Sequence, residues 1–239
     1  MKITLTYIHH NCFVLECSQR AFLFDYPGPA HLVEGAEAAM TRAISGKSLF
    51  IFSSHSHADH FHPDMQELCS PAARTWFVLS DDILDMFPEA VPRGSLIVEP
   101  EESYEFMGLT IDTLMSNDLG VAFLIRLGDL IIYYGGDLAN WNWDSDPVKQ
   151  RRFTQNFFSA ALRRISTHAV DVAFSNADKR LRSQCGAEEF VRTIRPKVFV
   201  PMHTFGHLDW LEGLIAPTEE SGSKLFTYAK PGDTVEFEV

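Results

Sequence analysis

The sequence has few cysteines, and none of them has the spacing of a redox or metal-binding motif. Cys12, Cys17, Cys69 and Cys185 are the only four among 239 residues, and no two form a Cys-x-x-Cys pair. This excludes a dithiol redox motif and a zinc site built from paired thiolates. We expect free, buried thiols instead. Cys12 follows two histidines, but nothing marks a lowered thiol pKa, so we interpret it as an apolar strand residue rather than a nucleophile.

Long apolar runs are also missing. No stretch approaches about 20 consecutive apolar residues, which excludes a transmembrane helix. Residues 1–17 alternate polar and apolar side chains and lack the unbroken apolar core of a signal peptide. We therefore expect a cytoplasmic location and no membrane partner.

Basic residues are in short supply. The chain has 20 Lys and Arg against 32 Asp and Glu, a formal net charge of -12. Binding to a nucleic-acid backbone needs a surplus of Lys and Arg. The short basic runs at residues 149–153 and 180–183 are interpreted as solvated faces of a helix or loop. We expect a small-molecule substrate and no nucleic-acid partner; a homo-oligomer is left open.

The order of elements repeats without a linker or a low-complexity segment. Hydrophobic residues make up 46% of the chain, enough for a sizeable core in one domain over residues 1–239. Strands followed by strand–helix alternation occur twice, which predicts two similar halves, each a mixed sheet with helices outside. We expect strands at residues 2–8, 12–17, 21–26, 48–54, 74–80, 94–99, 103–116, 121–127, 130–136, 170–175, 196–203, 223–229 and 233–239. We expect helices at residues 32–46, 62–69, 82–87, 147–165, 185–194 and 207–215.

Residues 53–65, SSHSHADHFHPDM, concentrate four of the ten histidines and Asp59 after an apolar strand. Imidazole and carboxylate groups need partners when they are buried. A helix would turn His55, His57, Asp59 and His60 to different faces, so they converge only if a strand ends and a loop curls around a metal ion. Nitrogen and oxygen donors suit Zn²⁺, Fe or Mn²⁺, and the absence of thiolates disfavours a closed structural zinc site.

Four segments in order resemble the metallo-β-lactamase superfamily. They are AFLFD at 21–25, HSHADH at 55–60, LIIYYGGD at 130–137 and PKVFVPMH at 196–203. The small size and the second and fourth segments resemble the lactonase-like hydrolase branch. The resemblance implies an α/β fold, an αβ/βα four-layer sandwich of two mixed β-sheets flanked by helices. It also implies a binuclear centre, with zinc expected and Mn or Fe as alternatives.

The resemblance assigns the metal ligands residue by residue. His55 and His57 match ligands of the first metal, and Asp59 and His60 match ligands of the second. Asp137 matches the carboxylate that bridges both ions, and His203 completes the second site. Asp25 is expected to orient a ligand histidine rather than to bind metal.

The implied activity is that of a metal-dependent hydrolase with Asp59 and Asp137 as its catalytic residues. A metal-bound hydroxide would attack an ester, lactone, amide or phosphoester of a small metabolite, which we expect to be phosphorylated or carboxylated. Three alternatives stay open: a phosphodiesterase or nuclease of the same fold, a non-catalytic metal-binding scaffold, and an iron enzyme that handles oxygen.

One position departs from the family pattern. The first metal usually has a third histidine, but this chain has none between His62 and His168. Asp118 is the strongest donor in the corresponding stretch, LMSNDLG; Ser116 and Asn117 are weaker. A carboxylate there would favour Mn²⁺ or Fe over zinc. The alternative is that Asp118 only caps the turn before Gly120.

Other residues near these motifs are less tied to the site. His62 is expected to border it, and His207 with Asp209 to lie at the mouth of a pocket. His9 and His10 are placed either at the site or on the surface. Trp141 and Trp143 form either a wall for the substrate or part of the packing.

Overall fold

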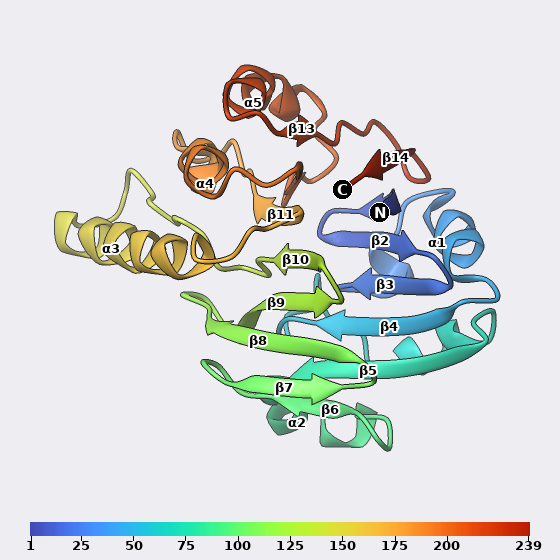
Figure 1. Cartoon of the computed structure of the whole chain (residues 1–239). Coiled ribbons are helices and arrows are strands. Elements are labelled where there is room, and N and C mark those ends of the chain that lie inside the picture. The colour runs from blue at the N-terminus through green and yellow to red at the C-terminus, as the bar shows by residue number, and fades with distance from the viewer. The chain divides into compact units, whose positions relative to one another are not determined.

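The strands of the computed structural model form two mixed seven-stranded sheets, one in each compact unit of the chain (Figure 1). Residues 1–239 are described. The first unit is Met1–Glu99 with Tyr228–Glu238, and the second is Pro100–Thr227 with Val239. The expectation of two halves, each with a mixed sheet and helices, is confirmed. That they form a single domain stays a prediction.

The sheet of the first unit is antiparallel at one side and parallel at the other. Its order is β14-β1-β2-β3-β4-β5-β6. The pairs from β14 to β3 are antiparallel, and those from β3 to β6 are parallel. Parallel neighbours end at the same edge, so β3, β4 and β5 deliver the residues that follow them to one place. The strands are β1 (Lys2–His9), β2 (Cys12–Cys17), β3 (Arg20–Phe24), β4 (Ser48–Ser53), β5 (Arg74–Ser80), β6 (Leu96–Val98) and β14 (Thr234–Glu238).

Helix α1 (Ala36–Ile44) packs on this sheet through an apolar stripe at helical spacing. Met40 and Ile44 of the stripe join one buried cluster with Val14, Leu23 and Ile51 from three strands. The remaining helical segments of the unit are short: η1 (Pro29–His31), η2 (Met65–Cys69), α2 (Asp81–Met86) and η3 (Pro88–Ala90).

The second unit repeats this plan with larger helices. Its sheet has the order β13-β12-β11-β10-β9-β8-β7, antiparallel from β7 to β10 and parallel from β10 to β13. Phe158, Leu162, Phe190 and Phe199 lie in its core cluster, which joins two helices to the sheet. The elements are β7 (Ser103–Phe106), β8 (Leu109–Met115), β9 (Val121–Leu127), β10 (Leu130–Tyr134), α3 (Val148–Ile165), β11 (Val172–Asn176), η4 (Gln184–Gly186), α4 (Ala187–Ile194), β12 (Val198–Met202), α5 (Asp209–Glu220) and β13 (Lys224–Leu225).

Three predicted elements differ from the structure. The helix expected at residues 62–69 is only the single 3-10 turn η2, because Pro71 stops extension and so short a helix gains little. The strand expected at residues 103–116 is a hairpin, since Met107 and Gly108 both have positive φ, as a two-residue turn requires. The strand expected at residues 223–229 shrinks to Lys224–Leu225, which pairs only with β12 at the edge of the sheet.

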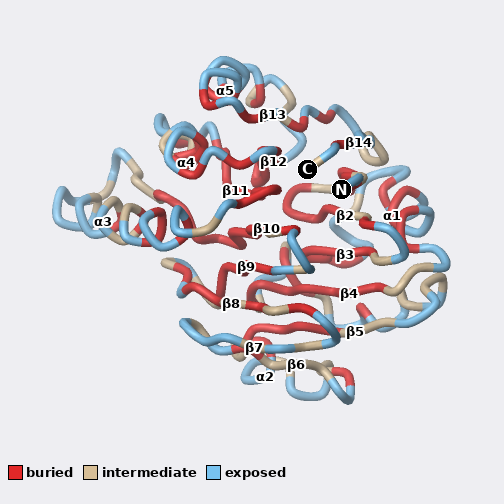
Figure 2. Tube along the Cα trace, in the orientation of Figure 1, coloured by how far each residue is buried: buried red, intermediate tan, exposed pale blue.

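Burial follows the expected pattern within each unit. Figure 2 shows buried positions along the strands and exposed positions on the outer faces of α3, α4 and α5. None of the helices combines the length and the apolarity that crossing a membrane requires.

The cysteines are free, as expected. Cys12, Cys17 and Cys185 are buried, while Cys69 is partly exposed. Burial raises the pKa of the Cys12 and Cys185 thiols well above the usual value. The interpretation of Cys12 as an apolar strand residue therefore agrees with its surroundings.

Candidate metal centre

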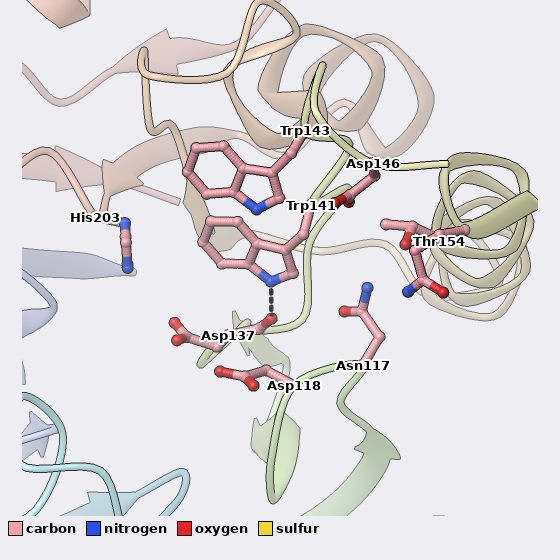
Figure 3. A pocket seen from close by; sticks show the side chains of 9 residues that line it. Asn117, Asp118, Asp137, Trp141, Trp143, Asp146, Thr154 and His203 are labelled. Carbon is pink, nitrogen blue, oxygen red and sulfur yellow. Dashed lines mark hydrogen bonds between the residues drawn. The ribbon is translucent and has the colours of Figure 1, made fainter. Parts of the chain in front are cut away.

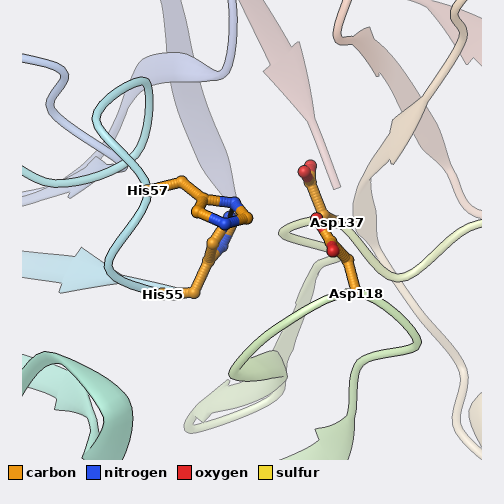
Figure 4. Close-up of side chains that lie close together, drawn as sticks. All are labelled: His55, His57, Asp118 and Asp137. Carbon is orange, nitrogen blue, oxygen red and sulfur yellow. Dashed lines mark hydrogen bonds between the residues drawn. The ribbon is translucent and has the colours of Figure 1, made fainter. Parts of the chain in front are cut away.

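The histidine-rich loop of the first unit begins at the carboxyl end of β4. Ser53, Ser54 and His55 are buried there, whereas His57 is exposed. His55 Nε2 and His57 Nδ1 lie 3.0 Å apart, and Figure 4 shows the two imidazoles turned toward each other. The backbone N–H of Ser56 donates to Asp82 of α2 at 2.8 Å, which fixes the loop between the two histidines.

Asp25 fixes the far end of the same loop. It follows β3, is fully buried and has a φ of 44°. Its Oδ1 accepts the Ser54 backbone N–H at 2.7 Å, and its Oδ2 accepts the Ser54 hydroxyl at 2.7 Å and lies 2.6 Å from His60 Nδ1. A proton on Nδ1 leaves the lone pair of His60 on Nε2, which lies 3.1 Å from the side-chain nitrogen of Asn11. This geometry agrees with an orienting role for Asp25.

His10 lies beside Asp59 in the first unit, with 3.6 Å between His10 Nε2 and Asp59 Oδ2. Burial acts to raise the pKa of Asp59, but the interactions with His10 and His60 outweigh it and hold that pKa below its usual value. His10 is only 3% exposed, so the surface role is wrong for this residue. The tight turn at His10 and Asn11 could have indicated this position from the sequence. It places both residues at the edge of the sheet where the histidine-rich loop begins.

Two carboxylates meet in the second unit. The turn from β8 to β9 and the chain that leaves β10 lie at the same edge, because β9 is antiparallel to both neighbours. Asn117 holds the two together: its side-chain amide donates to the Ala139 carbonyl at 2.8 Å and accepts the Ala139 N–H at 3.1 Å. The ligand oxygens of Asp118 and Asp137 consequently lie within 4.8 Å of one another (Figure 4).

Hydrogen bonds in the structure also support the interpretation of Asp118 as a turn residue. The Asp118 backbone N–H donates to the Ser116 hydroxyl at 3.2 Å, and the Ser116 N–H donates to the Gly120 carbonyl at 3.2 Å. These bonds use the backbone of Asp118 and leave its carboxylate directed toward Asp137. Turn chemistry and metal ligation are therefore compatible at this residue.

His203 follows β12 and is 6% exposed. Its Nδ1 lies 3.2 Å from Oδ2 of Asp178, a fully buried carboxylate that follows the neighbouring strand β11. Arg180 Nε donates to both oxygens of Asp178, at 3.0 and 2.9 Å. Burial acts to raise the pKa of Asp178, but His203 and Arg180 hold it below its usual value. Asp178 is not among the residues predicted from the sequence, although polar residues after the parallel strands β11 and β12 were a usable signal.

A pocket of about 390 Å³ opens beside these residues within the second unit (Figure 3). The indole N–H of Trp141 donates to the backbone oxygen of Asp137 at 2.7 Å. Trp141 and Trp143 line this pocket and also pack against Ala139, Leu181 and Cys185; a role as a wall for the substrate stays a prediction. The lining is formed by Asn117, Asp118, Asp137, Trp141, Trp143, Asp146, Gln150, Thr154 and His203.

Three other histidine or acidic residues lie elsewhere. His207 stacks on Trp210 with 4.7 Å between ring centroids, and Asp209 lies 3.8 Å from Lys179; neither lines this pocket. The expectation that they lie at its mouth is not met here. His62 packs edge-on against Tyr26 at 6.3 Å and accepts the Asp64 N–H at 3.2 Å, so it acts in the local turn.

Comparison with known families decides the class of the protein. A family model described as a beta-lactamase superfamily domain matches residues 4–150, more than half of the chain. The chain belongs to the metallo-β-lactamase superfamily. Among proteins with curated functions, none matches the sequence.

Solved structures share the fold along the whole chain. Igni18, a metallo hydrolase from the archaeon Ignicoccus hospitalis, superposes with a TM-score of 0.68 at 18% identity, covering 100% of both chains. A possible metal-dependent hydrolase from Veillonella parvula gives 0.61 at 13% identity over 98% of this chain and 99% of that one. The diiron β-hydroxylase CmlA from Streptomyces venezuelae gives 0.59 at 14% identity; the match covers 99% of this chain but 54% of CmlA. The predicted fold class of two mixed sheets flanked by helices is confirmed.

The donors of this superfamily member fit a divalent metal. In the second unit, Asp118 and Asp137 place two carboxylates within 4.8 Å, an arrangement that a cation would stabilise. In the first unit, His55 and His57 place two ring nitrogens 3.0 Å apart, and His60 has a defined tautomer. Such imidazole and carboxylate donors suit zinc, iron and manganese.

Proposed function

We propose that this protein is a metal-dependent hydrolase of the lactonase-like branch, acting on an ester, lactone, amide or phosphoester of a small metabolite. The proposed ligands are His55, His57, Asp59, His60, Asp137 and His203, with zinc as the first candidate and two ions as the expected number. The observation that carries the proposal is the pair of adjacent carboxylates, Asp118 and Asp137, on the wall of a pocket that also contains His203.

Divalent ions at such ligands polarise the oxygen of the scissile group and make water acidic enough to attack near neutral pH. The side chains of the protein orient these ligands. Asp25 binds His60 through Nδ1 and so turns Nε2 away from its own carboxylate, and Asp178 orients the ring of His203 in the same way. Trp141 anchors the backbone of Asp137, so the position of that carboxylate relative to the pocket is fixed. Asp59, whose pKa is held low, stays ionised at neutral pH and is suited to be a metal ligand rather than an acid.

Metal analysis of protein purified without chelator, combined with a panel of generic esters, lactones and phosphodiesters, tests the proposal. Asp137→Ala should abolish hydrolysis and lower the bound metal while the circular dichroism spectrum stays unchanged. Asp129→Ala, at an exposed hairpin position, is the matched control and should keep both metal and activity. Full hydrolysis with unchanged metal content in Asp137→Ala would rule out the proposed centre.

A second candidate is an iron enzyme that handles oxygen. The carboxylate of Asp118, in the place of a histidine, makes the donor set richer in oxygen and more favourable to iron. The similarity in fold to 54% of the diiron β-hydroxylase CmlA supports this candidate. Two equivalents of iron with a visible absorption band, together with no turnover on the hydrolytic panel, would select this candidate over a hydrolase.

A further inference from the structure

The pocket of the second unit contains an acidic residue that the proposed metal centre does not use. Asp146 lies in the segment between β10 and α3, and Figure 3 shows its carboxylate beside Trp141 and Trp143. Asp118 and Asp137 of the lining belong to the proposed metal centre, so Asp146 is the remaining carboxylate, and the lining contains no lysine or arginine. We propose that this pocket binds the ammonium group, protonated or quaternary, of an organic cation, which is held by the two tryptophans and Asp146. The proposal rests on the proposed function in one respect: the cation would be the recognition group of the hydrolysed substrate.

The carboxylate of Asp146 forms no ion pair or hydrogen bond within the protein, although its backbone N–H donates to the Trp143 carbonyl at 3.0 Å. Asp144, two positions earlier, differs in this respect because it pairs with Arg182 at 3.3 Å. The same short segment thus contains one aspartate that is neutralised on the surface and one that faces a pocket without a counter-charge. A ligand that brings a positive charge would supply it.

The tryptophans provide a surface suited to that charge. The Trp141 ring is held by its N–H bond to Asp137 and by edge-on packing against His203 at 5.1 Å, so its orientation is fixed. The Trp143 ring already has the Arg180 guanidinium 5.6 Å from its centroid. Indole faces attract cations through the negative potential of the ring, and ammonium ligands are bound in this way between aromatic side chains.

The position and size of the pocket agree with a small substrate. A volume of about 390 Å³ lies at the lower end of the range for small-molecule sites. Asp118, Asp137 and His203 line the same pocket, so a ligand with its amine near Asp146 would direct its other end to the proposed metal ligands. A terminal phosphate or carboxylate, as the sequence analysis expected, would meet Asp146 without a compensating cation from the lining. Gln150 and Thr154 offer hydrogen bonds to neutral parts of the ligand.

Choline and its neutral isostere 3,3-dimethylbutan-1-ol form a matched pair of probes, because they differ only in the charge of the quaternary centre. Their dissociation constants are measured by calorimetry, or by ligand-observed NMR, on the full-length protein as purified, with its metal. We expect choline to bind about tenfold more tightly than the alcohol. Asp146→Asn should remove most of this preference without changing the affinity for the alcohol.

Two further variants separate the charge from the aromatic wall. Trp143→Leu should weaken the binding of choline several-fold, and Trp143→Phe should restore part of the loss. Asp144→Asn, in the same segment but outside the pocket, should leave both dissociation constants unchanged. Equal affinity for the two probes, or no binding of choline at tens of millimolar, would overturn the proposal. Binding needs no turnover, so charge selectivity without hydrolysis of any ester, lactone, amide or phosphoester would reject the proposed function and retain the ammonium site.

Discussion

At the scale of single residues, the candidate site depends on carboxylates that fix histidine rings. Asp25 holds His60 in the first unit, and Asp178 holds His203 in the second. Each carboxylate is fully buried and follows a parallel strand adjacent to the one that leads to its histidine. A ring fixed at Nδ1 presents Nε2 in one direction. This lowers the conformational entropy that the histidine loses when it binds a metal ion.

Asp178→Asn should therefore weaken metal binding without changing the fold. Neutralising this carboxylate weakens its bond to His203 and loosens the ring, and such partners typically contribute a factor of about 10 to 100 in metal affinity. Competition of the variant with a chromogenic chelator measures the change. Asp209→Asn, an exposed aspartate beside Lys179, is the control and should keep the affinity of the parent protein. An unchanged affinity in Asp178→Asn would show that His203 is not a ligand or does not need its partner.

Asp118→Ala should remove one equivalent of metal and leave the other in place. Its carboxylate lies beside that of Asp137 and occupies the stretch where the family pattern has a histidine. Metal titration followed by mass spectrometry of the native protein counts the bound ions. Asp112→Ala, on β8 where Asp112 accepts the Ser103 hydroxyl, should retain both equivalents. Unchanged stoichiometry and affinity in Asp118→Ala would reduce Asp118 to its role in the turn.

At the scale of elements, the sequence predicted the strands that lead to the site better than the connections between them. Apolar runs before Asp25, His55, Asp137 and His203 are strong signals, and all four strands end within two residues of the expected position. The Met107–Gly108 turn was missed because an apolar methionine rarely has positive φ. Asp178 was missed and the role of His10 was left open, because both roles arise from neighbouring strands and strand order is not visible in local sequence patterns.

Gly186 shows how such a connection sets the position of a helix. It precedes α4 with a φ of 82°, and a Cβ there would lie 2.6 Å from the Phe158 ring of α3. We expect Gly186→Ala to destabilise the protein by about 3 kcal/mol, from backbone strain together with overpacking. Gly222→Ala, also at positive φ but facing open space, should cost only about 1 kcal/mol. Denaturant unfolding measures both values, and equal losses would contradict the packing argument.

At the scale of the whole molecule, the charge of -12 is the property with the clearest consequence for partners. We predict no useful binding of RNA or duplex DNA at about 150 mM salt, because neutralising phosphates requires an excess of basic side chains. Filter binding or fluorescence anisotropy across a salt series tests this. Sub-micromolar affinity with a steep dependence on salt would refute it and would favour the nuclease alternative.

The buried thiols give each compact unit its own reporter of opening. Cys12 and Cys17 belong to the first unit and Cys185 to the second, and all three are inaccessible in the native state. An alkylating reagent reaches them only when the surrounding structure opens, so the rate of modification at each cysteine follows the local opening equilibrium. Pulsed alkylation read by peptide mass spectrometry at rising denaturant would therefore show whether the two units lose protection together, as one cooperative domain must, or one before the other.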